Sequence, residues 1–468
     1  MSIVATSSPS EDDIKRIVPW ILYVIFFSVL NETVFNVATP SISEQFYLQA
    51  SQVSWIVTIF ILFFGIGSIM FGKLSDLFSL KHLMVIGIII YVSSSVLGFL
   101  FRDHYVTIIL FRAIQGLGAA SIPAINNTII TRYFTVTGRK KMFGLVTSAF
   151  SFGVAIGPVL GGYITGHIDW AYLFLIPVFT LAAIPFFLRL LPKEERKEGK
   201  FDLFGSILVS VMITSLMLFL TLMNPLYLVC SLVAGIWFVI HIRAHPYPFI
   251  QVAILRKPLY RTGIIIGFLV FSAYMTMMFL LPLLLSQLYA LRAETIGLVM
   301  FPGAICAALC GKLAGDSIVK RGAWYVTIAG LGLIALGFLF VWLSIDQRVW
   351  WIVVALMVLN IGNAFSQTSL TESVSSTLHE NQIGIGMGVF NLGLFFAQAL
   401  GTSVAAKLLD VSFLNFPFHP FVLKEQSFVY ANVTLLLLVI ILYSALMYFS
   451  FSRRANQISH IGDEIHGN

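Results

Sequence analysis

Charged residues are scarce in this chain of 468 residues. Asp, Glu, Lys and Arg together make up 10% of it, whereas an ordinary soluble protein contains about 25%. Only 21 residues are acidic, while hydrophobic residues reach 58%, with 42 Phe and 35 Gly. A water-exposed surface cannot be built from so few polar side chains. The composition therefore excludes a string of soluble domains and predicts an all-α protein that crosses the bilayer many times.

Cysteine is nearly absent too. The three cysteines, Cys230, Cys306 and Cys310, all lie in apolar runs, which excludes a disulfide framework or a zinc-type spacing. His241 and His245 have the i, i+4 spacing of metal ligands. No acidic residue stands near them in the sequence, so we expect no metal site.

Nucleotide-binding and catalytic motifs are missing as well. The segment GSIMFGKL (67–74) nearly matches the phosphate-binding loop, but Leu74 replaces the required Ser or Thr, and an apolar helix precedes it instead of a strand. No nucleophile lies in a pattern with a base. We therefore expect neither enzyme activity, nor a cofactor, nor a nucleotide, and any pumping must use an ion gradient.

Long apolar runs dominate the chain, and a helix needs roughly 20 apolar residues to span a bilayer. Cutting the sequence at charges and turn residues predicts fourteen spans: 18–40, 51–72, 82–101, 105–131, 141–166, 170–190, 204–222, 225–243, 263–288, 295–315, 323–344, 348–371, 383–408 and 429–452.

The basic residues predict the orientation of these spans. With both termini on one side, that side holds 22 of the 28 Lys and Arg residues, the other side holds 5, and Arg112 lies within a span. Basic residues concentrate in cytoplasmic loops. We therefore expect a protein of the cell membrane with both termini in the cytoplasm, and the net charge of +7 needs no nucleic-acid partner.

A faint repeat predicts the domain organisation. GKLSD (72–76) closes the second span and GKLAGD (311–316) closes the tenth. In a protein of two six-helix halves the second copy would close the eighth span, so two helices inserted between the halves explain why it closes the tenth. Such halves place a transport path between them. The predicted divisions are a tail (1–17), a first bundle (18–190), a linker (191–203), two inserted helices (204–243), a loop (244–262), a second bundle (263–452) and a tail (453–468).

Ionisable residues occur within two spans. Glu32 lies about 21 Å along the first span, at about 1.5 Å per residue, where a carboxylate must be paired or protonated. Asn36 follows one turn later. In the fourth span, Arg112 shares a helix face with Gln115. These residues either carry protons and contact substrate, or they only hold helices together. For Arg112 a third alternative is that its long side chain reaches the membrane surface.

Glycine patterns mark two further spans. At the end of the second, Gly72, Asp76 and Lys81 form a helix-end pattern that either gates the cytoplasmic side or is a plain solvated turn. In the fifth span, small residues at a spacing of four form a ridge for close helix packing, which either moves or only packs tightly. The ridge consists of Gly153, Gly157, Pro158, Gly161 and Gly162.

Polar residues also dot other apolar spans. Each of them either contacts substrate or forms a hydrogen bond between helices. They are Asn126 and Asn127 in the fourth span, Asn360, Asn363 and Gln367 in the twelfth, and Asn391 and Gln398 in the thirteenth.

Taken in order along the chain, these motifs resemble those of the major facilitator superfamily, and more narrowly the 14-helix drug:proton antiporters, with the tetracycline efflux pumps of the K and L classes nearest. The resemblance is carried by LNETVFNVATP (30–40), GKLSDLFSLK (72–81), LFRAIQGLGAA (110–120) and GVAIGPVLGG (153–162). The chain departs from the L-class pumps at Val154 and Gln398, which stand where those pumps have glutamates.

The resemblance implies proton-coupled export of a small amphipathic drug by alternating access, with tetracycline, free or as a divalent-metal complex, as the leading substrate. It implies proton coupling by Glu32 and Arg112, and a cavity lined by the polar residues of the first, fourth, ninth and twelfth spans. Two alternatives stay open: export of an endogenous metabolite or of several lipophilic drugs, and a membrane sensor that transports nothing.

Overall fold

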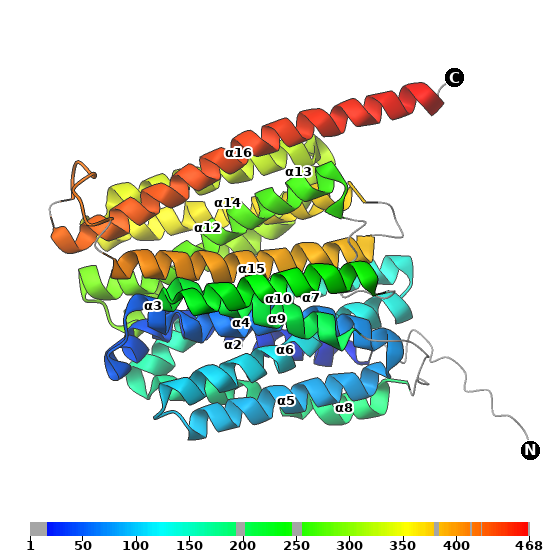
Figure 1. Cartoon of the computed structure of the whole chain (residues 1–468), viewed down its shortest axis with the longest axis horizontal. Helices are drawn as coiled ribbons and strands as arrows, with labels where there is room; N and C mark the ends of the chain where they lie inside the picture. Colours follow the sequence, from blue (N-terminus) through cyan, green and yellow to red (C-terminus); the bar gives the residue numbers. More distant parts are fainter. Residues whose placement is uncertain are drawn as a thin grey trace, which may run out of the picture.

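The structure is a computed structural model of the whole chain (Figure 1). It describes residues 16–192, 202–245, 255–378, 383–411, 414–422 and 424–466, with the side chains at positions 76, 136, 137, 140, 141, 383–385 and 452–466 left out. Over these ranges every regular element is a helix. Thirteen of the described helices are long and apolar enough to cross a membrane.

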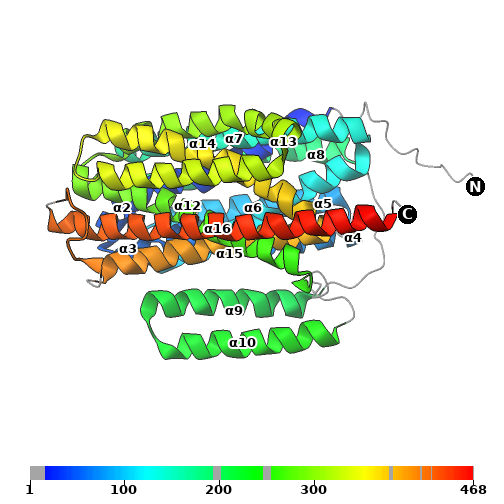
Figure 2. The ribbon, with the colours of Figure 1, turned by 90° about the horizontal axis from the view of Figure 1, so that it is seen from above.

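The helices run roughly side by side along the long axis of the molecule (Figures 1 and 2). α2 (Val18–Phe46) begins, and α16 (Glu425–His466) ends, at the same face, which we call the terminal face. The loop between α15 (Ile383–Asp410) and α16 lies at the other end of the bundle, which we call the loop face.

The helices of the first bundle are apolar segments, and polar residues cap the N-termini of two of them. Thr135 caps α7 by accepting a hydrogen bond from the Gly138 N–H, and Asp169 caps the next helix through the Ala171 N–H. The elements after α2 are α3 (Ala50–Val53), α4 (Trp55–Leu77), α5 (Leu80–Leu100), α6 (Tyr105–Tyr133), α7 (Val136–His167), the 3₁₀ helix η1 (Trp170–Ala183) and α8 (Ile184–Leu190).

Two helices stand apart from the rest of the molecule as a hairpin, α9 (Leu203–Leu222) and α10 (Pro225–Ala244) (Figure 2). α9 packs against α4 and α15, and the indole N–H of Trp55 donates to the Thr221 hydroxyl over 2.9 Å. α10 exposes Leu232, Ile236 and Ile240. An apolar outer face of this kind suits contact with lipid.

The second bundle consists of α12 (Pro258–Tyr289), α13 (Ala293–Ser344), α14 (Val349–Ser375), α15 and α16. α13 has 52 residues but is interrupted at Gly322, whose φ of 82° and ψ of 155° are not helical. A left-handed φ is accessible to glycine because it has no Cβ. On either side of this residue, Gly303 and Gly337 both lie against the same stretch of α14, around Leu356 and Leu359.

The sixth predicted span has the expected bounds, Trp170–Leu190, but an unexpected helix geometry, and the last helix is longer than its predicted span. The sixth predicted span (170–190) is a 3₁₀ helix followed by the short helix α8, and it contains Pro177, which has no N–H to donate. The chain is predicted to leave the last span as a tail at 453, whereas α16 continues to His466. No proline interrupts residues 453–466, so the backbone hydrogen bonds of the helix can continue.

Candidate functional site

Arg112 lies at the centre of the first bundle and is fully buried, with 0% of its surface exposed. Its Nε donates to the Ile56 carbonyl over 2.9 Å, and its Nη1 donates to Gln115 Oε1 over 2.6 Å and to Asn31 Oδ1 over 3.4 Å. The expected contact with Gln115 is therefore present. The arginine faces protein and does not reach the membrane surface.

Two phenyl rings enclose the same guanidinium. Its carbon lies 4.1 Å from the centre of the Phe35 ring and 4.2 Å from that of Phe60, a cation–π arrangement on both sides. The amide of Gln115 donates in turn to the Ser95 hydroxyl over 2.7 Å. Arg112 thus connects α2, α4, α5 and α6, although its Nη2 has no partner among the described residues.

Glu32 lies midway along α2 and is half-buried. Its charge and that of Arg112 interact, yet among the described residues no side chain forms a hydrogen bond or ion pair with its carboxylate. The carboxylate therefore lies in the field of a buried cation without being fixed to it. Asn36 follows on α2 and is also half-buried.

The glycines of α7 lie in a close helix–helix interface. A Cβ at Gly157 would clash with the Thr33 side chain, and one at Gly161 would lie 2.7 Å from the Val34 carbonyl oxygen, so both glycines face α2. Gly153 also faces α2, near Val29. On the other side, Gly162 meets Ala293, and the Pro158 carbonyl meets Gly297, both on α13. α7 is therefore held between the first bundle and the second.

The helix-end pattern of Gly72, Asp76 and Lys81 lies at the end of α4, on the terminal face of the molecule. The Ser75 hydroxyl is 3.2 Å from that of Thr128 on α6, and Arg132 Nη2 donates to the Ser75 carbonyl over 3.2 Å. Gly72 has open space around it, and Lys81 is half-buried at the start of α5. The side chain of Asp76 lies outside the described residues, so its predicted gating role stays a prediction.

Among the described residues of the second bundle, several buried hydrogen bonds join neutral side chains. The Tyr274 hydroxyl donates to Asn360 Oδ1 over 2.8 Å, Thr327 donates to Ser369 over 2.8 Å, and the Ser373 and Tyr448 hydroxyls lie 2.8 Å apart. Asn360 therefore pairs with a neighbouring helix. The buried amides of Asn126, on α6, and Gln398, on α15, have polar atoms without a partner among the described residues.

Two of the predicted cavity residues line one small pocket between α12, α14 and α15. Asn363, Gln367 and Thr371 supply its polar lining, and Phe271 and Phe390 supply aromatic walls. Its free volume is only about 20 Å³, so in this conformation it is far smaller than a small-molecule site, which typically measures about 300–1,000 Å³. Asn127 and Asn391 are exposed on α6 and α15 and do not line it.

Two polar contacts join the bundles at the loop face. The Asp410 carboxylate, at the end of α15, accepts the Ala50 and Ser51 backbone N–H groups over 2.9 and 3.0 Å. His167, at the end of α7, lies 3.2 Å from the Glu294 carboxylate at the start of α13. None of these residues was selected from the sequence, because their partners are distant along the chain and no local pattern marks them.

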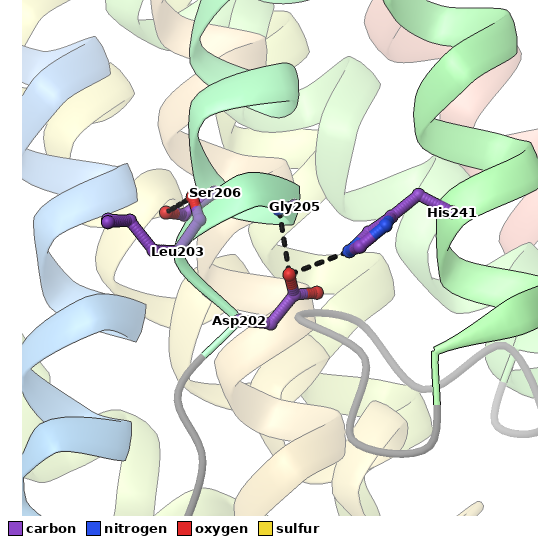
Figure 3. Close-up of polar contacts among 5 residues, drawn as sticks. All are labelled: Asp202, Leu203, Gly205, Ser206 and His241. Atoms are coloured by element: carbon purple, nitrogen blue, oxygen red, sulfur yellow. Dashed lines mark hydrogen bonds and ion pairs between the residues drawn. The ribbon is translucent and has the colours of Figure 1, made fainter.

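A cluster of one acidic and two histidine side chains lies where the inserted hairpin begins and ends. Asp202 Oδ1 is 2.7 Å from His241 Nε2, and it caps α9 by accepting the Gly205 N–H over 2.8 Å (Figure 3). His245 lies one turn beyond His241. The acidic residue that the sequence lacks near these histidines is thus supplied by the other helix of the hairpin.

Sequence reasoning also missed the partners of Arg112. Asn31 and Phe35 are four residues apart on α2 and both contact the guanidinium, so their i, i+4 spacing was the available signal. Tyr91 on α5 is fully buried, its hydroxyl has no described partner, and it interacts electrostatically with Arg112. Apolar context made it resemble a packing residue.

Comparison with known proteins gives a consistent picture. Residues 21–402 match the family model of the Major Facilitator Superfamily. The chain is 26% identical over 406 residues to the riboflavin transporter RibZ of Clostridioides difficile, a match that covers 81% of this chain and 89% of that protein. It is 24% identical over 428 residues to multidrug resistance protein 3 of Bacillus subtilis, covering 88% and 82% of the two chains.

Solved structures share the fold at low identity. A bacterial homologue of the human lysosomal transporter Spinster, in an inward-facing and unoccupied conformation, aligns with a TM-score of 0.69 at 12% identity, over 95% of this chain and 98% of that one. The human organic anion transporter MFSD10 aligns with a TM-score of 0.64 at 15% identity, over 94% and 100%. With its many apolar helices, this chain is a multi-pass membrane transporter that belongs to the Major Facilitator Superfamily.

Proposed function

We propose that this transporter is a proton-driven antiporter that exports small amphipathic drugs, with tetracycline as the leading substrate. It uses no nucleotide. Proton entry down its gradient supplies the free energy, and substrate leaves through alternating exposure of a site between the bundles. The substrate binds either free or as a divalent-metal complex.

The observation that carries the proposal is the environment of Glu32. An intramembrane carboxylate is costly and is a functional-site hypothesis by default. Glu32 is half-buried at the midpoint of α2, near the charge of Arg112, but without a fixed partner among the described residues. A carboxylate in that position can exchange a proton for a polar or cationic group of a substrate, whereas one locked in an ion pair cannot.

The side chains that meet between α12, α14 and α15 in the second bundle favour an amphipathic substrate. Asn363 and Gln367 offer amide donors and acceptors beside the rings of Phe271 and Phe390. Neutral amides suit a multi-oxygen aromatic molecule such as tetracycline, because they form hydrogen bonds without demanding one charge. The relative named a multidrug resistance protein favours drugs, while the relative named a riboflavin transporter favours a heteroaromatic metabolite.

The proposed topology has fourteen crossings. α13, as one straight helix of 52 residues, would be about 78 Å long at about 1.5 Å per residue, against a hydrocarbon core of about 30 Å. The break at Gly322 divides it into two lengths that each suit one crossing. With an even number of crossings and the excess of basic residues at the terminal face, both termini are cytoplasmic and the protein lies in the cell membrane.

Cysteine labelling tests this topology. Val411 and Phe78 are both exposed, at the loop face and the terminal face respectively. Val411→Cys should react with a membrane-impermeant maleimide in intact cells, and Phe78→Cys only after the membrane is opened. The reverse pattern would overturn the orientation.

Transport is tested in proteoliposomes loaded with a pH-sensitive dye. Tetracycline, with and without Mg²⁺, a flavin and a set of lipophilic cations are added in turn. Substrate-dependent proton movement, and uphill accumulation driven by an imposed pH gradient, are the expected results. A flavin response without a tetracycline response would select the metabolite exporter, and substrate movement indifferent to the pH gradient would exclude proton coupling.

A further inference from the structure

The inserted hairpin is fastened at its open end by three side chains that carry metal-ligand atoms. Asp202 precedes α9, His241 lies in the last turn of α10 and His245 directly follows that helix, so the cluster joins the residues where the chain enters and leaves the hairpin. One ligand atom from each of the three residues lies within 4.8 Å of the others. In Figure 3 the Asp202 carboxylate points towards the His241 ring.

The local structure holds the first two side chains in place. The side chain of Asp202 is 1% exposed and that of His241 is 19% exposed. The carboxylate is oriented by the N–H of Gly205, and the ring of Phe204 packs edge-on against His241, with 5.1 Å between ring centres. The His241 and His245 rings are 5.0 Å apart. Two of the ligands are therefore oriented before any ion arrives.

We propose that Asp202, His241 and His245 form a binding site for one divalent transition-metal ion such as Zn²⁺, Co²⁺ or Ni²⁺. Imidazole nitrogen with one carboxylate is a donor set that suits these ions, and three protein ligands leave a position for water. Zinc bonds of about 2.0–2.1 Å at tetrahedral angles separate the ligand atoms by about 3.3 Å. In the structure the Asp202 and His241 ligand atoms are 2.7 Å apart and all three ligand atoms lie within 4.8 Å of one another, so the separations are of the size that one ion requires.

The carboxylate can serve two partners at once. It offers about four lone-pair positions, so it can keep the cap to Gly205 while it binds the ion. The two histidines lie near the C-terminus of α10, where the helix dipole favours a cation. The charge of Lys73 also acts on Asp202, and this competing cation limits the affinity of the site.

The ion would clip α9 to α10 at the terminal face. The Ser231 hydroxyl joins the same two helices by donating to the Met212 carbonyl over 2.8 Å, and Gly235 lies against the Met212 side chain. The clip is built from residues outside both the Glu32–Arg112 centre and the pocket in the second bundle. Metal binding is therefore separable from transport.

Direct titration of the purified full-length protein tests the site. Co²⁺ is added to protein in detergent while its visible d–d absorption is recorded, and Zn²⁺ is then used to displace it. One equivalent of Co²⁺ with the intense absorption of a four- or five-coordinate ion is expected, together with a rise in the midpoint of thermal unfolding.

Three variants and a control assign the ligands. His241→Ala, His245→Ala and Asp202→Asn should each weaken Co²⁺ binding by at least ~10–100-fold, and Asn at 202 keeps the helix cap. His82→Ala, at the start of α5, should bind as the wild type does. Absence of a saturable Co²⁺ site in the wild type, or equal binding by all variants, would overturn the proposal.

Discussion

The two bundles bury polar groups of opposite character. In the first, a fully buried arginine is held by a carbonyl and two amides, and an unfixed carboxylate lies within its field. In the second, the buried hydrogen bonds described join neutral side chains, such as Tyr274 with Asn360 and Thr327 with Ser369. The same fold therefore carries a charged centre in one half and a neutral framework with a small pocket in the other.

We propose that this difference separates two tasks, proton coupling and substrate binding. Protonation of a carboxylate in a low-dielectric interior removes its attraction for a neighbouring cation. The energy of that cation then changes by several kcal/mol. Neutral hydrogen-bonded pairs do not respond to pH in that way, and they hold helices at a net gain of about 1 kcal/mol each. Coupling is therefore expected to depend on the first bundle and substrate fit on the second.

Replacing Glu32 by Gln gives the largest expected effect. Uphill export driven by a pH gradient should fall by ~100-fold or more, since the amide cannot carry the proton, while the protein still folds and binds drug. Transport into proteoliposomes is measured with and without the gradient. Glu372→Gln, an exposed carboxylate on α14, is the control. A well-expressed Glu32→Gln protein that keeps uphill transport would place coupling elsewhere.

Arg112→Lys tests whether the charge alone is sufficient in the first bundle. Lysine keeps the charge, but its ammonium lacks the planar guanidinium that lies against the two rings and the wide fork of donors that reaches separate acceptors. Stability should fall on the order of 2 kcal/mol, because buried acceptors lose their donor. Chemical unfolding is followed by tryptophan fluorescence. Arg102→Lys is the control, at an arginine that stacks on Phe99, and it should change the stability little. Equal losses of stability in the two variants would mean that only the charge of Arg112 matters.

Gly157→Leu probes the junction between the bundles. The added side chain would clash with Thr33, so stability should fall by about 1–3 kcal/mol and transport should be reduced. Gly144 lies on the same helix with open space around it, so Gly144→Leu is the matched control. Normal transport and stability in Gly157→Leu would mean that α7 and α2 are not closely packed in the membrane.

Tyr274→Phe tests the neutral framework of the second bundle. It removes the hydroxyl that donates to Asn360 and should cost about 1 kcal/mol of stability, with transport still coupled to protons. Unfolding midpoints are compared with those of Tyr443→Phe, whose ring is exposed on α16. Loss of proton coupling in Tyr274→Phe would contradict the proposal that coupling depends on the first bundle alone.

The smallest expected effect concerns His419, in the loop between α15 and α16. Its Nδ1 accepts the Phe421 N–H over 3.1 Å, so its Nε2 donates to the Trp342 carbonyl over 2.9 Å and the ring is neutral. Burial lowers the pKa of His419, against the opposing effects of that carbonyl and of the Asp346 carboxylate.

Because the unfolded chain binds this proton more readily, the folded state loses stability as the pH falls below the ordinary histidine pKa of about 6.5. The midpoint of thermal unfolding should therefore decrease on acidification. It should decrease less in His419→Gln, whose amide can form both hydrogen bonds. An identical pH dependence in the two proteins would contradict this role.

Much of the first bundle could be predicted from local pattern. Arg112 and Gln115 are three residues apart on one helix, and the glycines of α7 repeat at a spacing of four, so a helical wheel places each set on one face. Their surroundings could not be predicted in the same way. The i, i+4 spacing of Asn31 and Phe35 puts both on one face of α2, but it does not show that this face meets Arg112. It also does not show that Glu32 lacks a fixed partner among the described residues.

By itself the sequence determined the membrane class, the apolar helices and the residues that are costly to bury, because composition and periodicity are local properties. Tertiary structure alone decided which distant groups meet. Asp410 caps backbone N–H groups 360 positions earlier in the chain, and Asp202 reaches a histidine 39 positions later. These contacts depend on how helices pack in three dimensions, and packing is set by the fit of whole surfaces, which no short segment encodes.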